Sequence, residues 1–255
     1  MDIIVCMKLV PDLKHIRIKR ETREPILEGL PQVWGDMDKN ALEEAIRLRE
    51  KHGGKVTVLT AGWGKLKEAV VEALAMGADE GVIVADPAFQ TSDTAAIARV
   101  LASAARKMAP FDLILAAEGS TDGYSGQVGP RMAELLGLPQ VTYVREIAVE
   151  GGRLRAVRSL EESFEVVECP LPALVTVTQE INTPRLPPLT AILRAARKPQ
   201  QTFSAADLGI ADTSPVVARL SNLAPVQERK NILLQGPEAV AMLAAALERE
   251  GVLGS

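Results

Sequence analysis

The residues best suited to chemistry gather in one glycine-rich stretch, residues 111–139. An apolar run at 112–117 predicts a buried parallel strand, and a helical pattern at 127–136 follows, ended by Gly137. Between them lies a loop of small and polar residues, 118–126. Backbone N–H groups at the start of a helix bind anions, because they are unpaired and lie at the positive end of the helix dipole. The stretch therefore predicts a phosphate site.

The side chains of the loop fit the same interpretation. Glycine lets a backbone approach a phosphate closely, and hydroxyl groups add hydrogen-bond donors. The loop contains Gly119, Gly123 and Gly126, together with Ser120, Thr121 and Ser125. No complete GxGxxG or Walker pattern is present. An ordinary turn between a strand and a helix, which uses the same residue types, is therefore the alternative.

No catalytic constellation accompanies this loop. The only histidines, His15 and His52, lie in polar surroundings typical of a surface, and CxxC and HExxH are absent, so a metal site has little support. GxSxG is absent as well. Cys6, at the end of the first predicted strand, is better explained as a small packing residue than as a reactive thiol. These features favour a binding or carrier subunit.

Composition narrows the class further. The 255 residues carry a net charge of −4, with 47% hydrophobic and 3% aromatic residues, which argues against nucleic acid as a partner. Two distant cysteines indicate no disulfide framework. The first residues resemble a strand and not a signal peptide, and no window is apolar enough to cross a bilayer. We expect a cytoplasmic protein that is not embedded in a membrane.

The predicted elements alternate between strand and helix. This order predicts an α/β fold with a mainly parallel, doubly wound sheet covered on both faces. Ligands of such sheets bind beyond the carboxyl ends of the strands, where the loops after Met7, at 35–38, after Thr60 and at 118–126 would converge. The predicted strands are 2–7, 55–60, 80–85 and 112–117; the predicted helices are 37–51 (capped by Asp36 or Asp38), 66–76, 91–108 (begun by Ser92 or Asp93) and 127–136.

The second half of the chain has a different pattern. Alternating segments at 140–149, 153–158, 163–168 and 173–178 predict antiparallel strands that extend the sheet, and 16–18 with 25–27 predicts a small hairpin. From Asn182 the chain is rich in proline, with a short basic helix at 190–198, weak periodicity at 201–235 and a last helix at 237–250. We expect a nucleotide-binding domain at 1–181 and a C-terminal arm at 182–255, which wraps either this domain or a partner subunit.

The chain contains six motifs, from MKLVPD (7–12) to NTPRLPPLTAILRAARK (182–198). In their order along the chain they resemble the β subunit of electron-transfer flavoproteins. The resemblance spans nearly the whole chain and implies a heterodimer with an α subunit that makes most contacts to a redox FAD. It also implies a fold similar to adenine nucleotide α-hydrolases, with a structural AMP in this chain or, in electron-bifurcating relatives, a second FAD. The motifs are MKLVPD (7–12), ALEEAIRLRE (41–50), LAMGAD (74–79), STDGYSGQVGP (120–130), ECPLPALVTVT (168–178) and NTPRLPPLTAILRAARK (182–198).

The resemblance implies an electron carrier between flavin dehydrogenases, such as acyl-CoA dehydrogenases, and a membrane quinone oxidoreductase or another acceptor. Two alternatives from other classes share the α/β pattern. A homodimeric stress-type nucleotide-binding protein would not need the proline-rich tail. A nucleotide α-hydrolase enzyme would need an SGGxDS-like loop after the first strand, where Lys8 and the apolar residues after it stand instead.

The family's nucleotide positions carry over with departures. Residues 35–38 replace an Asn-Pro-aromatic segment, Glu118 stands where a basic residue is usual, and Tyr124 replaces an aspartate. These departures favour AMP, whereas the ending Gln127–Pro130 also occurs in bifurcating members. The cofactor-binding residues that the resemblance implies are Cys6, Gly35, Asp36, Met37, Asp38, Ala61, Ala117, Gly119, Ser120, Thr121, Asp122, Gly123, Tyr124, Ser125, Gly126, Gln127 and Val128.

The segment after Asn-x-Pro-Arg corresponds to a loop that recognises dehydrogenases through a leucine. By this resemblance the partner-binding residues are Leu189, Ile192 and Arg194. Without it, a short helix with a core-facing apolar side and a solvated basic side is the preferred interpretation.

Overall fold

The computed structural model describes residues 1–217, 223–226 and 230–253. The chain divides into two compact units. The first comprises Met1–Arg17 and Ile26–Ser221, and the second comprises Ile18–Pro25 and Asn222–Ser255. The predicted arm at 182–255 is therefore shared between the two units. The weakly periodic stretch predicted at 201–235 includes 218–222 and 227–229, which lie outside the described residues.

A nine-stranded sheet forms the centre of the first unit, in the order β11-β10-β9-β12-β8-β1-β6-β7-β13. All pairs from β9 through β12, β8, β1, β6 and β7 to β13 are parallel. The strands are β1 (Ile3–Cys6), β6 (Val56–Gly62), β7 (Glu80–Ala85), β8 (Leu113–Ala117), β9 (Gln140–Glu150), β10 (Arg153–Ser159), β11 (Phe164–Pro170), β12 (Ala173–Val177) and β13 (Gln200–Phe203).

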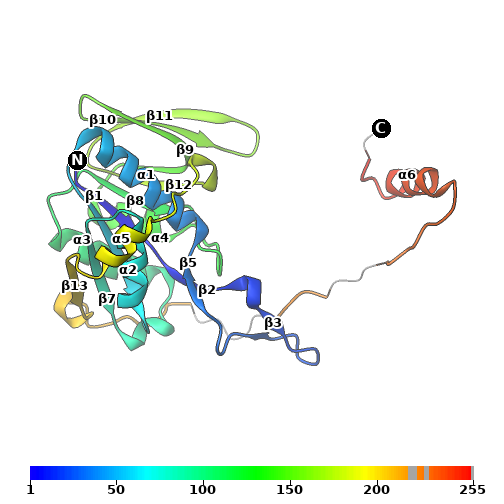
Figure 1. Ribbon diagram of the computed structural model, residues 1–255, viewed down its shortest axis with the longest axis horizontal. Coiled ribbons are helices and arrows are strands. Elements are labelled where there is room, and N and C mark those ends of the chain that lie inside the picture. Colours follow the sequence, from blue (N-terminus) through cyan, green and yellow to red (C-terminus); the bar gives the residue numbers. More distant parts are fainter. Residues whose placement is uncertain (218–222, 227–229, 254–255) are drawn as a thin grey trace. The chain divides into compact units, whose positions relative to one another are not determined.

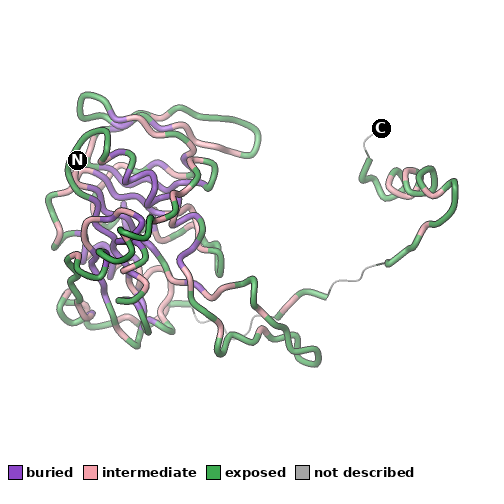
Figure 2. The backbone as a smooth tube through the Cα atoms, in the orientation of Figure 1, coloured by how far each residue is buried: buried purple, intermediate pink, exposed green. Residues whose placement is uncertain are grey.

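Helices cover both faces of the sheet (Figure 1). On one face lie α1 (Asp36–His52), α2 (Leu66–Met76) and α5 (Leu189–Ala195); on the other lie α3 (Thr94–Lys107) and α4 (Val128–Leu136). Successive side chains of a strand point to opposite faces, so Ile3 and Val5 join one core, and Ile4 and Cys6 join the other. Figure 2 shows that the buried residues are concentrated in the central sheet and the helices that cover it. The predicted doubly wound α/β fold with an antiparallel extension is confirmed.

The position of β12 corrects one expectation. Residues 173–178 were expected to add an antiparallel strand, but β12 lies between β8 and β9 and is parallel to both. All of Ala173–Val177 is buried, as is typical of a central parallel strand. The antiparallel pairs of this sheet are β9 with β10 and β10 with β11. After this meander the chain returns to the sheet interior, where a continuous apolar strand is needed.

Several boundaries are also informative. α1 begins after Gly35 without a side-chain cap, so the expected capping by Asp36 or Asp38 is wrong. Asp93 caps α3 by accepting from Ala95 N and Ala96 N, as predicted. The strand β13, which pairs with β7, was not expected.

Two small sheets contain the other strands of the described residues. β2 (Leu9–Pro11) pairs with β5 (Gln32–Trp34), and β3 (Arg17–Ile18) pairs with β4 (Pro25–Ile26). The second of these is the small hairpin that the sequence predicts.

The second unit contains α6 (Ala239–Arg249), the predicted last helix. Val240 and Leu243 on this helix are exposed, and Lys230 forms an ion pair with Glu250 at 2.6 Å. Within the described ranges, no helix has both the length and the apolar character that crossing a bilayer requires.

Candidate functional site

The candidate site lies where the strand order reverses. From β1 the chain adds β6 and β7 on one side, and then returns to place β8 on the other side of β1. The carboxyl ends of β1 and β8 are therefore neighbours whose connections leave in different directions, which is where ligands of such sheets bind. The loop at 118–127, Lys8 and the start of α1 meet at this edge.

A polar network joins these three segments. Lys8 Nζ lies 2.8 Å from both carboxylate oxygens of Asp122 and 3.4 Å from Ser120 Oγ. Ser120 Oγ in turn donates to Asp122 Oδ1 at 2.6 Å. Partial burial raises the pKa of Asp122, but the hydrogen bonds from Lys8 and Ser120 outweigh it, so the pKa falls below its usual value. The glycine-rich loop is thus anchored to the end of β1 by an ion pair.

Asp38 connects α1 to the same strand end. Its Oδ2 accepts from Lys8 N at 3.1 Å, and its residue is only 5% exposed. Burial raises the pKa of Asp38 to about 7, more than the hydrogen bond from Lys8 lowers it. A Cβ atom on Gly35 would lie 2.7 Å from Asp38 Oδ2, so this close approach requires glycine. Asp38 is therefore a buried carboxyl group with a raised pKa at the base of the site.

Cys6 is a packing residue and not a thiolate. Its Sγ lies 4.0 Å from Met132 Sδ in the second core. Burial, followed by the charge of Asp38, raises the pKa of Cys6 to about 12. Because the thiolate is the nucleophilic form, this thiol is not activated. The geometry supports the packing role that the sequence analysis prefers for Cys6.

Tyr124 closes the loop on itself. Its hydroxyl donates to the carboxylate of Glu118, and this bond raises the pKa of Tyr124 to about 12. The ring packs on Gly119, where an added Cβ would lie 3.1 Å from it. Tyr124 and Gly126 have φ angles of +41° and +64°, in the left-handed region. Tyr124 and Glu118 thus form a pair that shapes the loop.

The start of α4 offers backbone donors. Gln127 precedes the helix without capping it; its Oε1 accepts instead from Thr94 Oγ1 at 2.8 Å and from Arg131 Nη2 at 3.1 Å. The described residues supply no acceptor for the backbone N–H groups of Val128 and Gly129. Such groups at a helix start are suited to an anion.

Gly129 is needed for packing. An added Cβ there would lie 2.6 Å from Thr176 Cγ2. The absence of a side chain lets α4 approach β12 closely, which fixes the helix start at the edge of the sheet.

The structure brings together some predicted site residues and not others. Ser120, Asp122 and Asp38 are joined through Lys8. Ala61 lies near the carboxyl end of β6, Met37 is buried in the first turn of α1, and Asp36 is exposed. Ala117 ends β8, and the remaining predicted residues form the loop and the start of α4: Gly119, Thr121, Gly123, Tyr124, Ser125, Gly126, Gln127 and Val128.

Three residues of the site were not predicted. Lys8 is the first charged residue after the first buried strand, and this position is a signal that could have identified it. Thr94 opens a predicted helix, but its bond to Gln127 follows only from how α3 and α4 pack. Tyr143, whose hydroxyl lies 3.8 Å from an added Cβ on Gly126, owes its direction to an irregular part of β9 with φ +58°. Periodicity could not have shown it.

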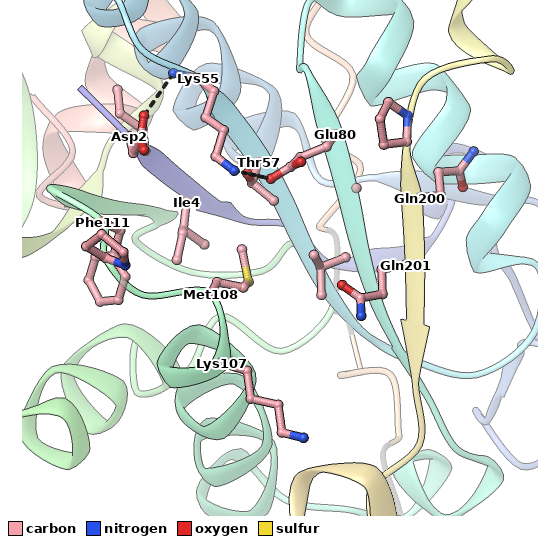
Figure 3. Close-up of a pocket in the computed structure, with 15 residues that line it drawn as sticks. Asp2, Ile4, Lys55, Thr57, Glu80, Lys107, Met108, Phe111, Gln200 and Gln201 are labelled. Carbon is pink, nitrogen blue, oxygen red and sulfur yellow. Dashed lines mark hydrogen bonds and ion pairs between the residues drawn. The ribbon is translucent and has the colours of Figure 1, made fainter.

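A cavity of about 350 Å³ lies at the opposite, amino end of the strands (Figure 3). Its charged groups already have partners: Lys55 Nζ lies 2.8 Å from Glu80 Oε1, which also accepts from Thr57 Oγ1. Lys107 Nζ donates to Asp207 O at 2.6 Å. These pairs leave little binding capacity, so the carboxyl edge remains the candidate site.

The predicted partner-binding residues lie on α5 and are exposed. Leu189 is 70% exposed, and Ile192 and Arg194 are exposed as well. The core-facing residue of this helix is Ala195, which is fully buried. The alternative of a helix whose large apolar residues face the core is therefore not what the structure contains.

Fold and site together define a doubly wound α/β protein with a candidate ligand-binding edge and, among the described residues, no cluster that could hold a metal ion. The model of the electron transfer flavoprotein domain matches residues 28–208. The chain belongs to the electron transfer flavoprotein family, as its motifs indicated, and to the beta subunits within it. It is thus a flavoprotein subunit of electron transport.

Three relatives illustrate this membership. Electron transfer flavoprotein subunit beta of Thermoanaerobacterium thermosaccharolyticum is 44% identical over 81% of this chain and 79% of the relative. The subunit beta of Clostridium acetobutylicum is 41% identical over 82% and 81%. Subunit CarD of the caffeyl-CoA reductase-Etf complex of Acetobacterium woodii is 37% identical over 89% and 86%.

Proposed function

We propose that this chain is the β subunit of a heterodimeric carrier that binds one structural AMP at the carboxyl edge. It also helps an α subunit hold the FAD that carries electrons. The electrons come from flavin dehydrogenases, such as acyl-CoA dehydrogenases, and pass to a membrane quinone oxidoreductase or another acceptor. We place the carrier in the cytoplasm.

The observation that carries the proposal is the uncapped start of α4 at the switch in strand order. Val128 and Gly129 present N–H groups there, and Thr121 and Ser125 in the preceding loop add hydroxyl groups, whereas the hydroxyl of Ser120 donates to Asp122. A phosphate would accept from these donors and benefit from the helix dipole. The donor set thus fits the phosphate of an adenine nucleotide.

The charges at the edge favour AMP over a second FAD. Asp122 already neutralises Lys8, and Glu118 adds a carboxylate where a basic residue is usual in the family. A second FAD is also larger than AMP and needs more room at this edge. Tyr124 also fills space beside Gly119. A second FAD remains the alternative, because Gln127–Pro130 matches bifurcating members.

The chain's own residues bind and position; they do not perform substrate chemistry. The thiol of Cys6 is held protonated, and the lysine at the edge is held in an ion pair. The FAD, when bound between the subunits, supplies the redox chemistry. We therefore assign a carrier role and not an enzymatic one.

We also propose that α5 docks the electron-donating dehydrogenase. Leu189 and Ile192 would bury apolar surface against the donor, and Arg194 would pair with acidic groups on it. Exposed large apolar side chains in a contiguous group mark interaction sites, and single anchors often dominate their energetics.

Co-expression with the α subunit tests the proposal. We expect a one-to-one heterodimer that is yellow from FAD and that accepts electrons one at a time through a flavin semiquinone. A colourless homodimer that binds ATP or AMP when both chains are present would contradict it and support a stress-type nucleotide-binding protein.

A further inference from the structure

The segment that precedes α5 is fastened to α1 by a pair of asparagines. Asn40 Nδ2 donates to Asn182 O at 2.7 Å and to Asn182 Oδ1 at 3.2 Å. Asn182 Nδ2 donates to Asn40 O at 3.0 Å and to Glu44 Oε2 at 3.0 Å. Because Asn40 is only 5% exposed, these bonds form away from water, where leaving them unmade is costly.

Arg185 adds a forked ion pair to the same helix. Its Nε lies 2.8 Å from Glu43 Oε2, and its Nη1 lies 2.6 Å from Glu50 Oε1. Its backbone N–H also donates to Glu43 Oε2, at 3.2 Å. Burial raises the pKa of Glu43, but hydrogen bonds from Arg185 and Arg47 outweigh it and lower the pKa overall. The planar guanidinium directs separate N–H groups to the two carboxylates in a fixed fork, whereas a lysine would offer one flexible point charge.

The far end of α5 is fastened to α2, beside which it lies in Figure 1. Ala195 is fully buried. Lys198 Nζ donates to Leu74 O at 2.9 Å and to Ala78 O at 2.5 Å. These carbonyls lie at the end of α2, where a cation is favoured by the helix dipole.

Between these two attachments, the recognition segment (residues 186–195) exposes its large apolar side chains. Leu186, Leu189 and Leu193 are 90%, 70% and 71% exposed. α5 has seven residues, and so short a helix is unstable without tertiary contacts. Its exposed leucines contribute few such contacts, so the attachments at its ends must hold its conformation.

We propose that Asn40, Glu43 and Arg185 are positioning residues for docking: they hold the recognition segment in the conformation that the electron donor binds. The inference rests on the proposed docking role of α5. The pair Glu43–Arg185 places the chain at the entrance to α5, so that Leu189 and Leu193 are presented outward before the donor arrives. Docking then does not have to order the segment, which improves apparent affinity.

The test uses the whole heterodimer with Arg185→Ala and Arg185→Lys. Arg49→Ala is the matched control, because Arg49 is on α1, and its hydrogen bonds and ion pair go to Gly77 O and Asp79 and not to the segment. Two quantities are measured: amide hydrogen exchange of residues 189–195, and the KM for the carrier in flavin reduction by the donor dehydrogenase. FAD and nucleotide contents show whether each variant is folded.

We expect Arg185→Ala to speed exchange in α5 and to raise the KM about tenfold, as if one molecule in about ten were competent to dock. The kcat, FAD content and nucleotide content should be unchanged. Arg185→Lys should give an intermediate KM, and Arg49→Ala should match the wild type in both measurements.

Unchanged exchange and unchanged KM in Arg185→Ala would overturn the inference, and so would a KM increase shared equally by Arg49→Ala. If Arg185→Ala speeds exchange but neither it nor Leu189→Ala changes the KM, docking at α5 is itself wrong. If Leu189→Ala raises the KM and Arg185→Ala does not, docking stands and the positioning role fails.

Discussion

Helix α1 carries a buried carboxyl group in each of two regions, and the surroundings shift the pKa of these two groups in opposite directions. At its start, Asp38 accepts a backbone hydrogen bond from Lys8, while the Lys8 ammonium is bound to Asp122. Farther along, Glu43 is held by Arg47 and Arg185. The pKa of Asp38 is raised to about 7 by burial. That of Glu43 is lowered because, despite its burial, two arginines hydrogen-bond to it.

The difference between these two pKa shifts indicates that the two carboxyl groups have different roles. At the carboxyl edge the chain tolerates an unfavourable buried charge, as is common where a group is kept for binding. In the second region, Arg47 and Arg185 both form ion pairs with Glu43, and the bond from Arg185 holds the segment before α5 in place. The first region should become more stable when its carboxylate is neutralised, and the second less stable.

The largest effect is expected at Asp38. Its folded pKa exceeds the unfolded value, so the native state binds more protons and stability falls as pH rises from about 4 to about 7. Asp38→Asn keeps an acceptor for Lys8 N and removes the charge. At about pH 8 it should raise the free energy of unfolding by up to about 4 kcal/mol.

Thermal unfolding of the heterodimer at several pH values measures this, with Asp36→Asn, an exposed neighbour, as the control. The gain should shrink as pH falls toward about 4 and disappear below about pH 3, where Asp38 is protonated in both states. A loss of stability at high pH in Asp38→Asn would mean that the charge is favourable, and the contrast with Glu43 would disappear.

Leu189→Ala comes next. Removing a buried anchor costs on the order of 2 kcal/mol, which is roughly a thirtyfold loss of affinity for the donor dehydrogenase. FAD and nucleotide should stay bound, because Leu189 lies outside the carboxyl edge. Flavin reduction measured against carrier concentration gives the effect, with Leu135→Ala, a partly exposed leucine on α4, as the control.

Arg194→Glu should act differently, through association that depends on salt. If Leu189→Ala keeps normal transfer but releases FAD, the leucine is structural and the docking assignment is wrong.

Glu43→Gln should be destabilising by about 1–2 kcal/mol at neutral pH, because hydrogen bonds to a charged group are lost while the arginines stay. The lowered pKa of Glu43 means that its contribution is present above the unfolded value and is lost as pH falls through the folded one. The difference from the wild type should therefore narrow below about pH 4. Denaturant unfolding at two pH values measures it; a difference that does not depend on pH would contradict the ion-pair explanation.

The smallest effect is expected at Tyr124. Tyr124→Phe keeps the ring against Gly119 and removes the hydrogen bond to Glu118, at a cost of about 1 kcal/mol. AMP affinity, measured by calorimetry on heterodimer stripped of nucleotide, should fall less than about tenfold. A complete loss of binding would place the hydroxyl on the ligand instead of on Glu118.

The parts of the fold that depend on local pattern were predictable from the sequence. Helix α2 and strand β7 have the predicted bounds, because apolar periodicity and Gly77 define them. The position of β12 was not predictable, since alternation and burial say little about which strands become neighbours. The cap of α1 was missed because Asp38 turns toward Lys8, a contact across thirty residues of chain.

The candidate site shows the same division. The loop from Gly119 to Gly126 could be identified from its composition and family pattern, because backbone donors need small residues. The network of Lys8, Asp122 and Asp38 required the three-dimensional arrangement, since it joins three separate segments of the chain. Likewise, Arg185 belonged to a recognisable motif, but its ion pairs with Glu43 and Glu50 follow only from how the tail crosses α1.

The nucleotide content of the purified heterodimer tests the proposed site most directly. Acid-denatured protein should release AMP and FAD in about one equivalent each, since one helix start serves one phosphate site. Gly126→Val, which forces a branched residue into the left-handed region at φ +64°, should lose AMP and keep FAD, whereas Gly123→Ala, with no atom nearer than 3.9 Å to the added Cβ, should keep both. Two equivalents of FAD and no AMP would contradict the AMP assignment, and no nucleotide beyond the shared FAD would contradict the site.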